Sequence, residues 1–182
     1  YSANGLEFDS SGNLFVTNSA YGGPDPFSVV KLTPSGPDWT RSSFVSYGTP
    51  NYSPFDVATD AANNVYVSSA LATSTISKYS SAGVLDGTFT ISGIASDLMM
   101  AGLTYANNKL YAVDYGDYKM YEIDPTTGAA TNFIGSGNLP DYRSNFLTYY
   151  AVPEPSIMAL VAFGGLALVG RRVSRKNSRV SC

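Results

Sequence analysis

Residues 5–16, GLEFDSSGNLFV, recur in altered form as residues 56–67, DVATDAANNVYV, and as residues 102–113, GLTYANNKLYAV. In each copy, apolar residues two positions apart stand on both sides of a short segment rich in Asn or Gly. This period places apolar side chains on one face of a strand, and Asn and Gly favour tight turns. Each copy therefore predicts a β-hairpin.

Two further strands are predicted after each hairpin. The third strands are expected at Ser28–Leu32, Thr75–Tyr79 and Lys119–Ile123, and the fourth near Arg41–Tyr47, Thr88–Ile91 and Ala130–Ile134. Turns at residues 33–36, 80–83 and 124–128 separate the third strands from the fourth. Four antiparallel strands that recur at a fixed spacing are typical of β-propeller blades. We favour blades over a sandwich with accidental similarity, because the order of strands and turns recurs three times.

The predicted fold class is all-β, a partial β-propeller of about three four-stranded blades followed by a short C-terminal hydrophobic helix. Residues 1–150 form the repeat domain, with repeats at about 4–48, 54–96 and 101–136, and residues 151–182 form a sorting and anchoring segment, with the helix at about 156–170. Closed propellers usually have about four to eight blades. Because the chain starts with Tyr1 inside a repeat, we expect a C-terminal piece of a longer precursor, with further blades before Tyr1. Expressed alone, it should keep an open edge that favours association.

The phrase N-G-L-x-F-D-x-x-G-N-L-F-V, from Asn4 to Val16, resembles NHL-type and gluconolactonase-like propellers, and the likeness extends over most of residues 1–135. The resemblance implies that each outer strand packs against the next blade. It also implies a divalent metal in the central channel, which gluconolactonases hold with Glu, Asn and Asp. One such Asn precedes Gly-Leu and maps to Asn4, whereas the matching Phe55 and Ala101 cannot bind a metal. The acidic ligands have no counterpart here, so Asn4 is a weak metal candidate and we expect no cofactor.

The other candidate sites give weak indications of binding or catalysis. Asp114 and Asp117 offer two carboxylates three positions apart, which could bind a cation or act as a glycosidase-like pair if about 5–9 Å separated them. We favour a solvated turn, as for most acidic loops that contain Gly. The 14 Tyr residues could stack on sugars, but at alternating strand positions we favour core packing. No phosphate-binding loop or nucleophile elbow is present, and no catalytic residue is predicted.

Composition excludes several classes of function. The chain has no His, which removes Ser-His-Asp and Cys-His catalysis and His-ligated zinc. Cys182, the single cysteine, cannot form an intrachain disulfide, and we interpret it as incidental. Residues 1–150 hold 6 Lys/Arg and 13 Asp/Glu, and this acidic balance argues against nucleic-acid binding. Only 14% of residues are charged, against roughly 25% in an average domain, which suits an extracellular protein rich in strands and turns.

The C-terminal segment has the layout of a membrane signal. Thirteen apolar residues run without interruption from Ile157 to Val169 and would span about 20 Å as a helix. That length also fits a buried core helix, but this one has no polar face, and a basic cluster follows it as in stop-transfer segments. We therefore favour membrane insertion, with residues 1–150 on the far side from the basic cluster. The membrane segment includes Ile157, Leu160, Phe163, Leu166 and Val169.

The order of these parts resembles the PEP-CTERM sorting signal of Gram-negative bacteria, which is also described as an ice-binding protein C-terminal domain. The sorting motif is Val152, Pro153, Glu154, Pro155 and Ser156, and the basic stop is Arg171, Arg172, Arg175 and Lys176. The resemblance implies recognition by an exosortase-type membrane enzyme that cleaves near Pro-Glu-Pro, and cargo linked to extracellular polysaccharide and biofilm matrix. Family tails usually end soon after the arginines, whereas this one continues to Cys182, which bears on its processing. No regular Thr-x-Thr ladder indicates ice binding.

These observations predict an exported cell-surface or extracellular-matrix protein with a binding or structural propeller body. Its expected partners are membrane lipid, an exosortase-type sorting enzyme, and polysaccharide or another surface protein. Two alternatives stay open: a metal-dependent lactone hydrolase of gluconolactonase type, and a surface adhesin anchored permanently in the membrane. The expected location is the cell envelope, with anchoring by the C-terminal helix or release to the matrix after processing.

Overall fold

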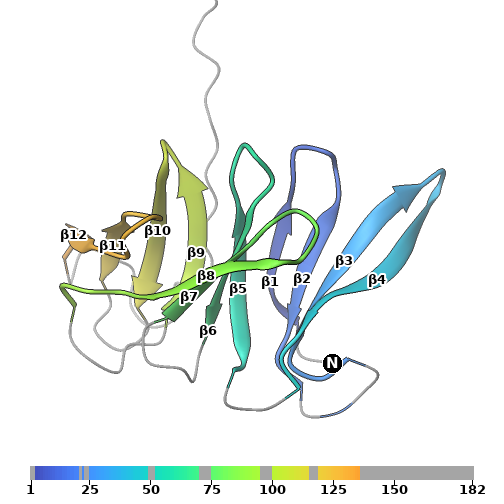
Figure 1. The fold of residues 1–182 in the computed structure, drawn as a ribbon, viewed down its shortest axis with the longest axis horizontal. Helices are drawn as coiled ribbons and strands as arrows, with labels where there is room; N and C mark the ends of the chain where they lie inside the picture. The colour runs from blue at the N-terminus through green and yellow to red at the C-terminus, as the bar shows by residue number, and fades with distance from the viewer. Residues whose placement is uncertain are drawn as a thin grey trace, which may run out of the picture. The chain divides into compact units, whose positions relative to one another are not determined.

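The computed structural model describes residues 3–20, 22, 25–48, 52–69, 75–94, 100–114 and 119–135. All of them belong to the first of the two units into which the chain divides, Tyr1–Tyr149 and Tyr150–Cys182. They form twelve β-strands in three four-stranded antiparallel sheets, and each sheet contains four consecutive strands (Figure 1). The predicted partial propeller of three four-stranded blades is therefore confirmed.

Each sheet follows the chain order of its strands. The first sheet contains β1 (Ala3–Phe8), β2 (Leu14–Asn18), β3 (Ser28–Ser35) and β4 (Asp38–Ser46). The second contains β5 (Pro54–Thr59), β6 (Val65–Ser69), β7 (Thr75–Tyr79) and β8 (Leu85–Thr90). The third contains β9 (Met100–Ala106), β10 (Lys109–Asp114), β11 (Met120–Ile123) and β12 (Ala130–Ile134). The predicted helix at residues 156–170 lies outside the described residues. Within the described ranges, no helix is long and apolar enough to cross a membrane.

Local turn chemistry explains the three predicted hairpins. The Asp9 carboxylate accepts the backbone N–H groups two and four residues ahead at 2.9 Å each, and Asp60 repeats this in the second sheet. Gly12 and Asn63 take positive φ angles of 80° and 63°, which Gly and Asn tolerate better than other residues. The third hairpin turns at residues 107–108, where both Asn residues have positive φ, as a two-residue hairpin turn requires.

One predicted turn is wrong in position. The turn expected at residues 33–36 lies at Gly36 and Pro37, because β3 continues through Pro34 to Ser35. The pairing of β2 with β3 ends at Leu32, so beyond that residue β3 has only β4 as a neighbour. Proline lacks a donor N–H and is tolerated in a strand where one side is unpaired. The strand-breaking signal of Pro34 is therefore overridden by its place in the sheet.

Two hydrophobic clusters join neighbouring sheets. The buried residues between the first and second sheets are Phe15, Val29, Val57, Val65, Val67 and Tyr79. Those between the second and third sheets are Ala58, Tyr66, Ile76, Ile91, Met100, Leu103, Leu110, Ala112, Tyr121 and Ile123. Full burial of one large apolar side chain contributes about 1.5–3 kcal/mol. The second sheet therefore buries one apolar face against the first sheet and the other against the third. A sheet of a two-layer sandwich buries only one face.

The sheets also meet through their inner and outer strands. Inner strand β5 contacts β1 on one side and β9 on the other, as Figure 1 shows. Beyond outer strand β8, the N–H of Ser92 donates to the carbonyl of Gly128 at 3.0 Å, and the N–H of Ala130 donates to the carbonyl of Ser92 at 2.9 Å. Contact along the outer side agrees with the blade packing that the resemblance to NHL-type propellers implies.

Candidate functional site

Polar side chains are buried at one end of the three sheets. Asn18, Ser69 and Asp114 are the last residues of β2, β6 and β10, and they are 4%, 8% and 0% exposed. Each pairs with the first residue of its neighbouring inner strand, so the three hold equivalent places. Buried polar groups are normally held by hydrogen bonds, and loops beside a rigid scaffold often carry function. We call this region the polar end; it includes Asn4, Thr17, Asn18, Ser19, Asp56, Ser68, Ser69 and Asp114.

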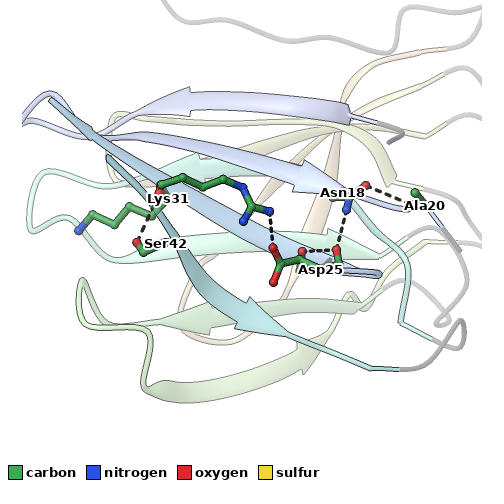
Figure 2. A network of polar contacts seen from close by, with 7 residues as sticks. Asn18, Ala20, Asp25, Lys31 and Ser42 are labelled. Atoms are coloured by element: carbon green, nitrogen blue, oxygen red, sulfur yellow. Dashed lines mark hydrogen bonds and ion pairs between the residues drawn. The ribbon is translucent and has the colours of Figure 1, made fainter. Parts of the chain in front are cut away.

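In the first sheet, Asn18 fixes the connection that leads to β3. Its amide Nδ2 donates to the carbonyl of Asp25 at 2.6 Å, and its Oδ1 accepts the N–H of Ala20 at 3.2 Å. Both contacts are drawn as dashed lines in Figure 2. The hydroxyl of Ser28 donates to the same carbonyl at 2.8 Å. The Asp25 carboxylate forms an ion pair with Arg41 on β4. Side chains of three strands of the first sheet therefore hold Asp25.

Asn4, the predicted weak metal candidate, lies on β1 at the polar end. Its amide Nδ2 donates to the hydroxyl of Ser19 at 2.7 Å. The equivalent residues on the other inner strands are Phe55 and Ala101, which supply no side-chain oxygen. Among the residues that the structure describes, no group of three or more acidic, Cys or His side chains could hold a metal. The role of Asn4 as a ligand stays a prediction.

A hydroxyl supports an irregular inner strand in each of the first two sheets. The pairing of β1 with β2 shifts register between Ala3 and Leu6, and β5 shifts against β6 in the same way. Thr17 accepts the N–H of Gly5 at 2.7 Å and donates to the carbonyl of Phe55, in the next sheet, at 2.9 Å. Ser68 accepts the N–H of Asp56 at 3.1 Å. These hydroxyls satisfy backbone groups that the bulges remove from the ladder.

Asp56 joins the second and third sheets, and sequence reasoning missed this role. Its Oδ1 accepts the N–H of Val57 at 2.8 Å, and its Oδ2 accepts the N–H of Leu103, on β9, at 2.7 Å. The side chain is 4% exposed. In the sequence, Asp56 stands where the other two repeats have Gly5 and Gly102. A single carboxylate at a position otherwise held by glycine was the available signal.

Glu7 and Asp56, two acidic side chains on neighbouring inner strands, have perturbed pKa values. Burial raises the pKa of the Glu7 carboxyl, on β1, to about 7. Burial also raises the pKa of Asp56 to about 7, with a smaller contribution from the negative charge of Glu7, while the N–H groups of Leu103 and Val57 act in the opposite direction. Desolvation disfavours the charged form of a carboxyl group, and a second carboxylate nearby adds to this. The two groups therefore take up protons near neutral pH.

The stability of the folded chain should decrease as the pH rises from about 4.5 to 8. Both carboxyl pKa values are raised above their ordinary range, so the folded state holds protons that the unfolded chain has already released. Replacing Glu7 by Gln should flatten this decrease and should stabilise the chain at pH 8 by about 1 kcal/mol, a value reduced for solvent screening. Urea unfolding at several pH values measures both effects.

Asp124→Asn is the matched control for this experiment. The N–H groups of Thr126 and Thr127 lower the pKa of Asp124, so its carboxylate is already ionised throughout the range. The control should keep the slope of the parent chain between pH 5 and 8. A Glu7→Gln chain with the same slope as the parent would show that Glu7 does not titrate in this range.

Most other predicted site residues lie beyond the part of the chain that the structure describes. Asp114 is the last residue of β10 and is fully buried, so the solvated turn that the sequence favoured is wrong for this residue. Asp117 lies outside the described residues, so the alternative of a carboxylate pair is untested. The same holds for the sorting motif at 152–156, the membrane segment at 157–169 and the basic stop at 171–176.

The tyrosines divide between the core and the surface. Tyr66, Tyr79 and Tyr121 are buried, as the alternation of strand positions predicts. Tyr52 is 46% exposed, and its ring stacks on that of Tyr47 with centroids 6.0 Å apart and planes 12° apart. The hydroxyl of Tyr79 donates to that of Tyr47 at 3.0 Å, which fixes the inner ring. Tyr52 thus presents a supported aromatic face after the end of β4.

The C-terminal segment matches a known sorting signal. Residues 151–176 match the PEP-CTERM protein-sorting motif. This motif belongs to exported proteins that are sorted to the cell envelope. No curated protein sequence matches the chain.

The described sheets resemble propeller-type proteins of known structure. A chain of the nidogen–laminin complex superposes with a TM-score of 0.57 at 13% identity, over 74% of this chain and 49% of the other. Virginiamycin B lyase from Staphylococcus aureus gives 0.52 at 17% identity, over 72% and 41%. A gluconolactonase from Xanthomonas campestris gives 0.44 at 20% identity, over 62% and 34%. The chain spans half or less of each of these proteins. Identities this low show the β-propeller fold alone.

Proposed function

We propose that this chain is a cell-surface protein whose propeller body binds or organises material outside the cell, and whose C-terminal segment directs it to the envelope and holds it in the membrane until a sorting enzyme processes it. The observation that carries the proposal is the PEP-CTERM motif at residues 151–176, which follows the three propeller sheets in the chain. Sorting explains the sharp change from an acidic body to an apolar and basic tail. The proposal gives the body a binding or structural role and not a catalytic one.

The tail supplies a physical mechanism for retention. Apolar side chains from Ile157 to Val169 favour the hydrocarbon interior of a membrane. The following arginines stay on the cytoplasmic side, which stops export of the chain at that point. Proline disfavours helix at and before its own position, so Pro153 and Pro155 favour an extended stretch ahead of the apolar run. An exosortase-type enzyme in the membrane would then meet an accessible Pro-Glu-Pro segment next to a short apolar helix.

The body offers a surface suited to carbohydrate or to another surface protein. Tyr52 presents an exposed ring supported by Tyr47, and aromatic rings pack well on the apolar faces of sugars. One solved structure of similar fold is a complex of two proteins, nidogen and laminin. We propose polysaccharide as the first ligand to test and a protein as the second.

The test is to change Pro153, Glu154 and Pro155 to alanine in the chain expressed by a host that has the sorting enzyme. The parent chain should lose its C-terminal segment, whereas the variant should keep it and accumulate in the membrane fraction at least tenfold over the parent. Mass spectrometry of the mature protein measures the cleavage directly. Because the apolar run is unchanged, the variant should still insert in the membrane.

A control variant carries Val180→Ala and Ser181→Ala, which lie beyond the matched residues 151–176. This control should be processed like the parent chain. A mature parent chain that retains residues 157–182 would instead support the permanently anchored adhesin and would contradict processing at the motif.

A further inference from the structure

A hollow of about 250 Å³ lies between the second and third sheets, beside outer strand β8. We call it the outer hollow. Its described lining includes no residue of the polar end and does not include Tyr52. The residues used below are Lys78, Asp86, Gly87 and Phe89 of the second sheet, and Pro125 and Thr126 of the turn between β11 and β12. The outer hollow is therefore a separate place on the body.

The outer hollow has room because one strand position carries no side chain. Register pairs Lys78 of β7 with Tyr66 of β6 on one side and with Gly87 of β8 on the other. In the first sheet, Ser42 holds the place of Gly87, opposite Lys31. Among the described residues, a Cβ atom on Gly87 would meet nothing within 4 Å. Gly inside a strand weakens the strand and often marks the close approach of a ligand.

A β-bulge accompanies two opposite charges in the lining of the outer hollow. The register of β7 against β8 shifts between Lys78 and Tyr79, and a shift of this kind re-aims side chains. The Nζ of Lys78 lies 2.7 Å from the Oδ2 of Asp86, and the two side chains are 27% and 58% exposed. An ion pair this exposed adds little to stability. Both groups therefore stay available to bond to a ligand.

The opposite wall of the outer hollow is apolar and held in place. Phe89 packs against the buried cluster between the two sheets, and Pro125 lies in the turn that faces it. The Asp124 carboxylate accepts the N–H groups of Thr126 and Thr127 at 2.8 and 3.1 Å, which fixes this turn. A wall that is ordered before binding reduces the entropy that binding costs.

We propose that the outer hollow binds one ring of a neutral saccharide through two adjacent hydroxyl groups. One hydroxyl accepts a hydrogen bond from the Nζ of Lys78, and its neighbour donates to the carboxylate of Asp86. Hydrogen bonds to charged groups are stronger than those between neutral groups. The apolar side of the ring faces Phe89 and Pro125. The volume lies just below the range of about 300–1,000 Å³ for drug-sized ligands, which suits a single ring.

The charges of the lining select the class of ligand. An anionic ligand that bonds to Lys78 also meets the negative charge of Asp86, and a cationic ligand meets Lys78. A purely apolar ligand covers both charges without offering them hydrogen bonds, which is costly. A neutral ring with adjacent donors and acceptors avoids all of these costs. This inference rests on the function proposed above, because it assigns the polysaccharide a place on the body.

Saturation-transfer NMR titrations of the full chain, in a detergent without a sugar headgroup, test the proposal. The probes are the methyl glycosides of glucose, galactose and mannose, of which at least one should bind. Gly87→Val should weaken that binding by about tenfold or more, because the added side chain occupies the outer hollow. Val suits a strand, so the sheet should stay folded. Val84→Ser is the control, since Val84 is 66% exposed in the β7–β8 turn and should leave binding unchanged.

Asp86→Ala tests the hydrogen bonds and not only the space. This change removes the charged acceptor and should weaken binding of the neutral probe by about tenfold. Sodium sulfate that replaces chloride at equal ionic strength should not displace the sugar from the parent chain. Displacement by sulfate would show that Lys78 holds an anion and would contradict a neutral ligand.

Other results would also overturn the proposal. These are a parent chain that binds none of the neutral probes, and a folded Gly87→Val chain that binds like the parent. Binding that Tyr52→Ala removes and Gly87→Val leaves intact would place the sugar at Tyr52, and the proposed function would then stand without the outer hollow. Cleavage at the sorting motif is measured separately, so failure of the proposed function is distinguishable from failure of this site. Circular dichroism checks that each variant is folded.

Discussion

Replacing Gly5 by alanine should lower the free energy of unfolding by about 2–3 kcal/mol, towards the upper end of the usual cost of overpacking. A Cβ atom on Gly5 would lie 2.2 Å from the Oδ1 of Asp56 and 2.7 Å from its Cα, closer than real contacts of this kind, and the Cα cannot rotate away as a side chain can. The obstacle is backbone, so β1 and β5 would have to separate. That movement would disturb the bond from Thr17 to the carbonyl of Phe55 and the cluster around Phe15. Urea unfolding measures the loss.

Gly87→Ala provides the matched control for Gly5. Gly87 lies on β8, and a Cβ atom there would meet nothing within 4 Å. This change should be neutral or slightly stabilising, because it restricts the unfolded chain without a clash. If Gly5→Ala proved as mild as Gly87→Ala, the close approach of β1 to β5 would not be a feature of the folded protein.

In a host without the sorting enzyme, a chain that lacks residues 153–182 should appear in the medium and not in the cell envelope, where the uncleaved intact chain stays. The deletion removes eight large apolar side chains of the run from Ile157 to Val169, each worth roughly 0.3–0.6 kcal/mol of membrane insertion. Their sum is about 3 kcal/mol, which corresponds to a change of about 100-fold in partition. Quantitative immunoblots of the envelope and medium fractions measure the ratio.

Deletion of residues 177–182 alone is the control for the tail. These residues follow the matched motif and carry a single basic side chain, Arg179. The shorter deletion should leave the protein attached. Retention of the chain that lacks residues 153–182 at the level of the intact chain would contradict the assigned role of the C-terminal segment.

The sequence predicted the elements whose causes are local. Asp9 and Asp60 close their turns through hydrogen bonds to nearby backbone groups, so the hairpins could be recognised from a few adjacent residues. The alternation of apolar residues likewise located most strands. Pro34 shows the limit of this reasoning, because it stays in β3 where only one neighbouring strand is present.

The features that depend on distant residues were harder to predict. Asp56 accepts a hydrogen bond from the N–H of Leu103, which is 47 positions away in the sequence. This role depends on β5 and β9 lying side by side, which the sequence does not specify. The raised pKa of Glu7 follows from burial that the sequence does not specify. Among the 14 tyrosines, the sequence did not distinguish Tyr52, and the structure shows that its ring is exposed. Asn4 was named through a family resemblance, and its hydrogen bond to Ser19 was not foreseen.

The order of the sheets in space follows their order in the chain, and this has a mechanical consequence. A tensile force applied beyond β12 loads the third sheet first, and the second sheet only after the junction at Asp56 and Leu103 has parted. Such a molecule would unfold one sheet at a time, and each unfolded sheet would lengthen the chain while the sheets nearer Tyr1 stay folded. A protein attached to a surface on the C-terminal side of β12 would in this way absorb shear as a series of small extensions.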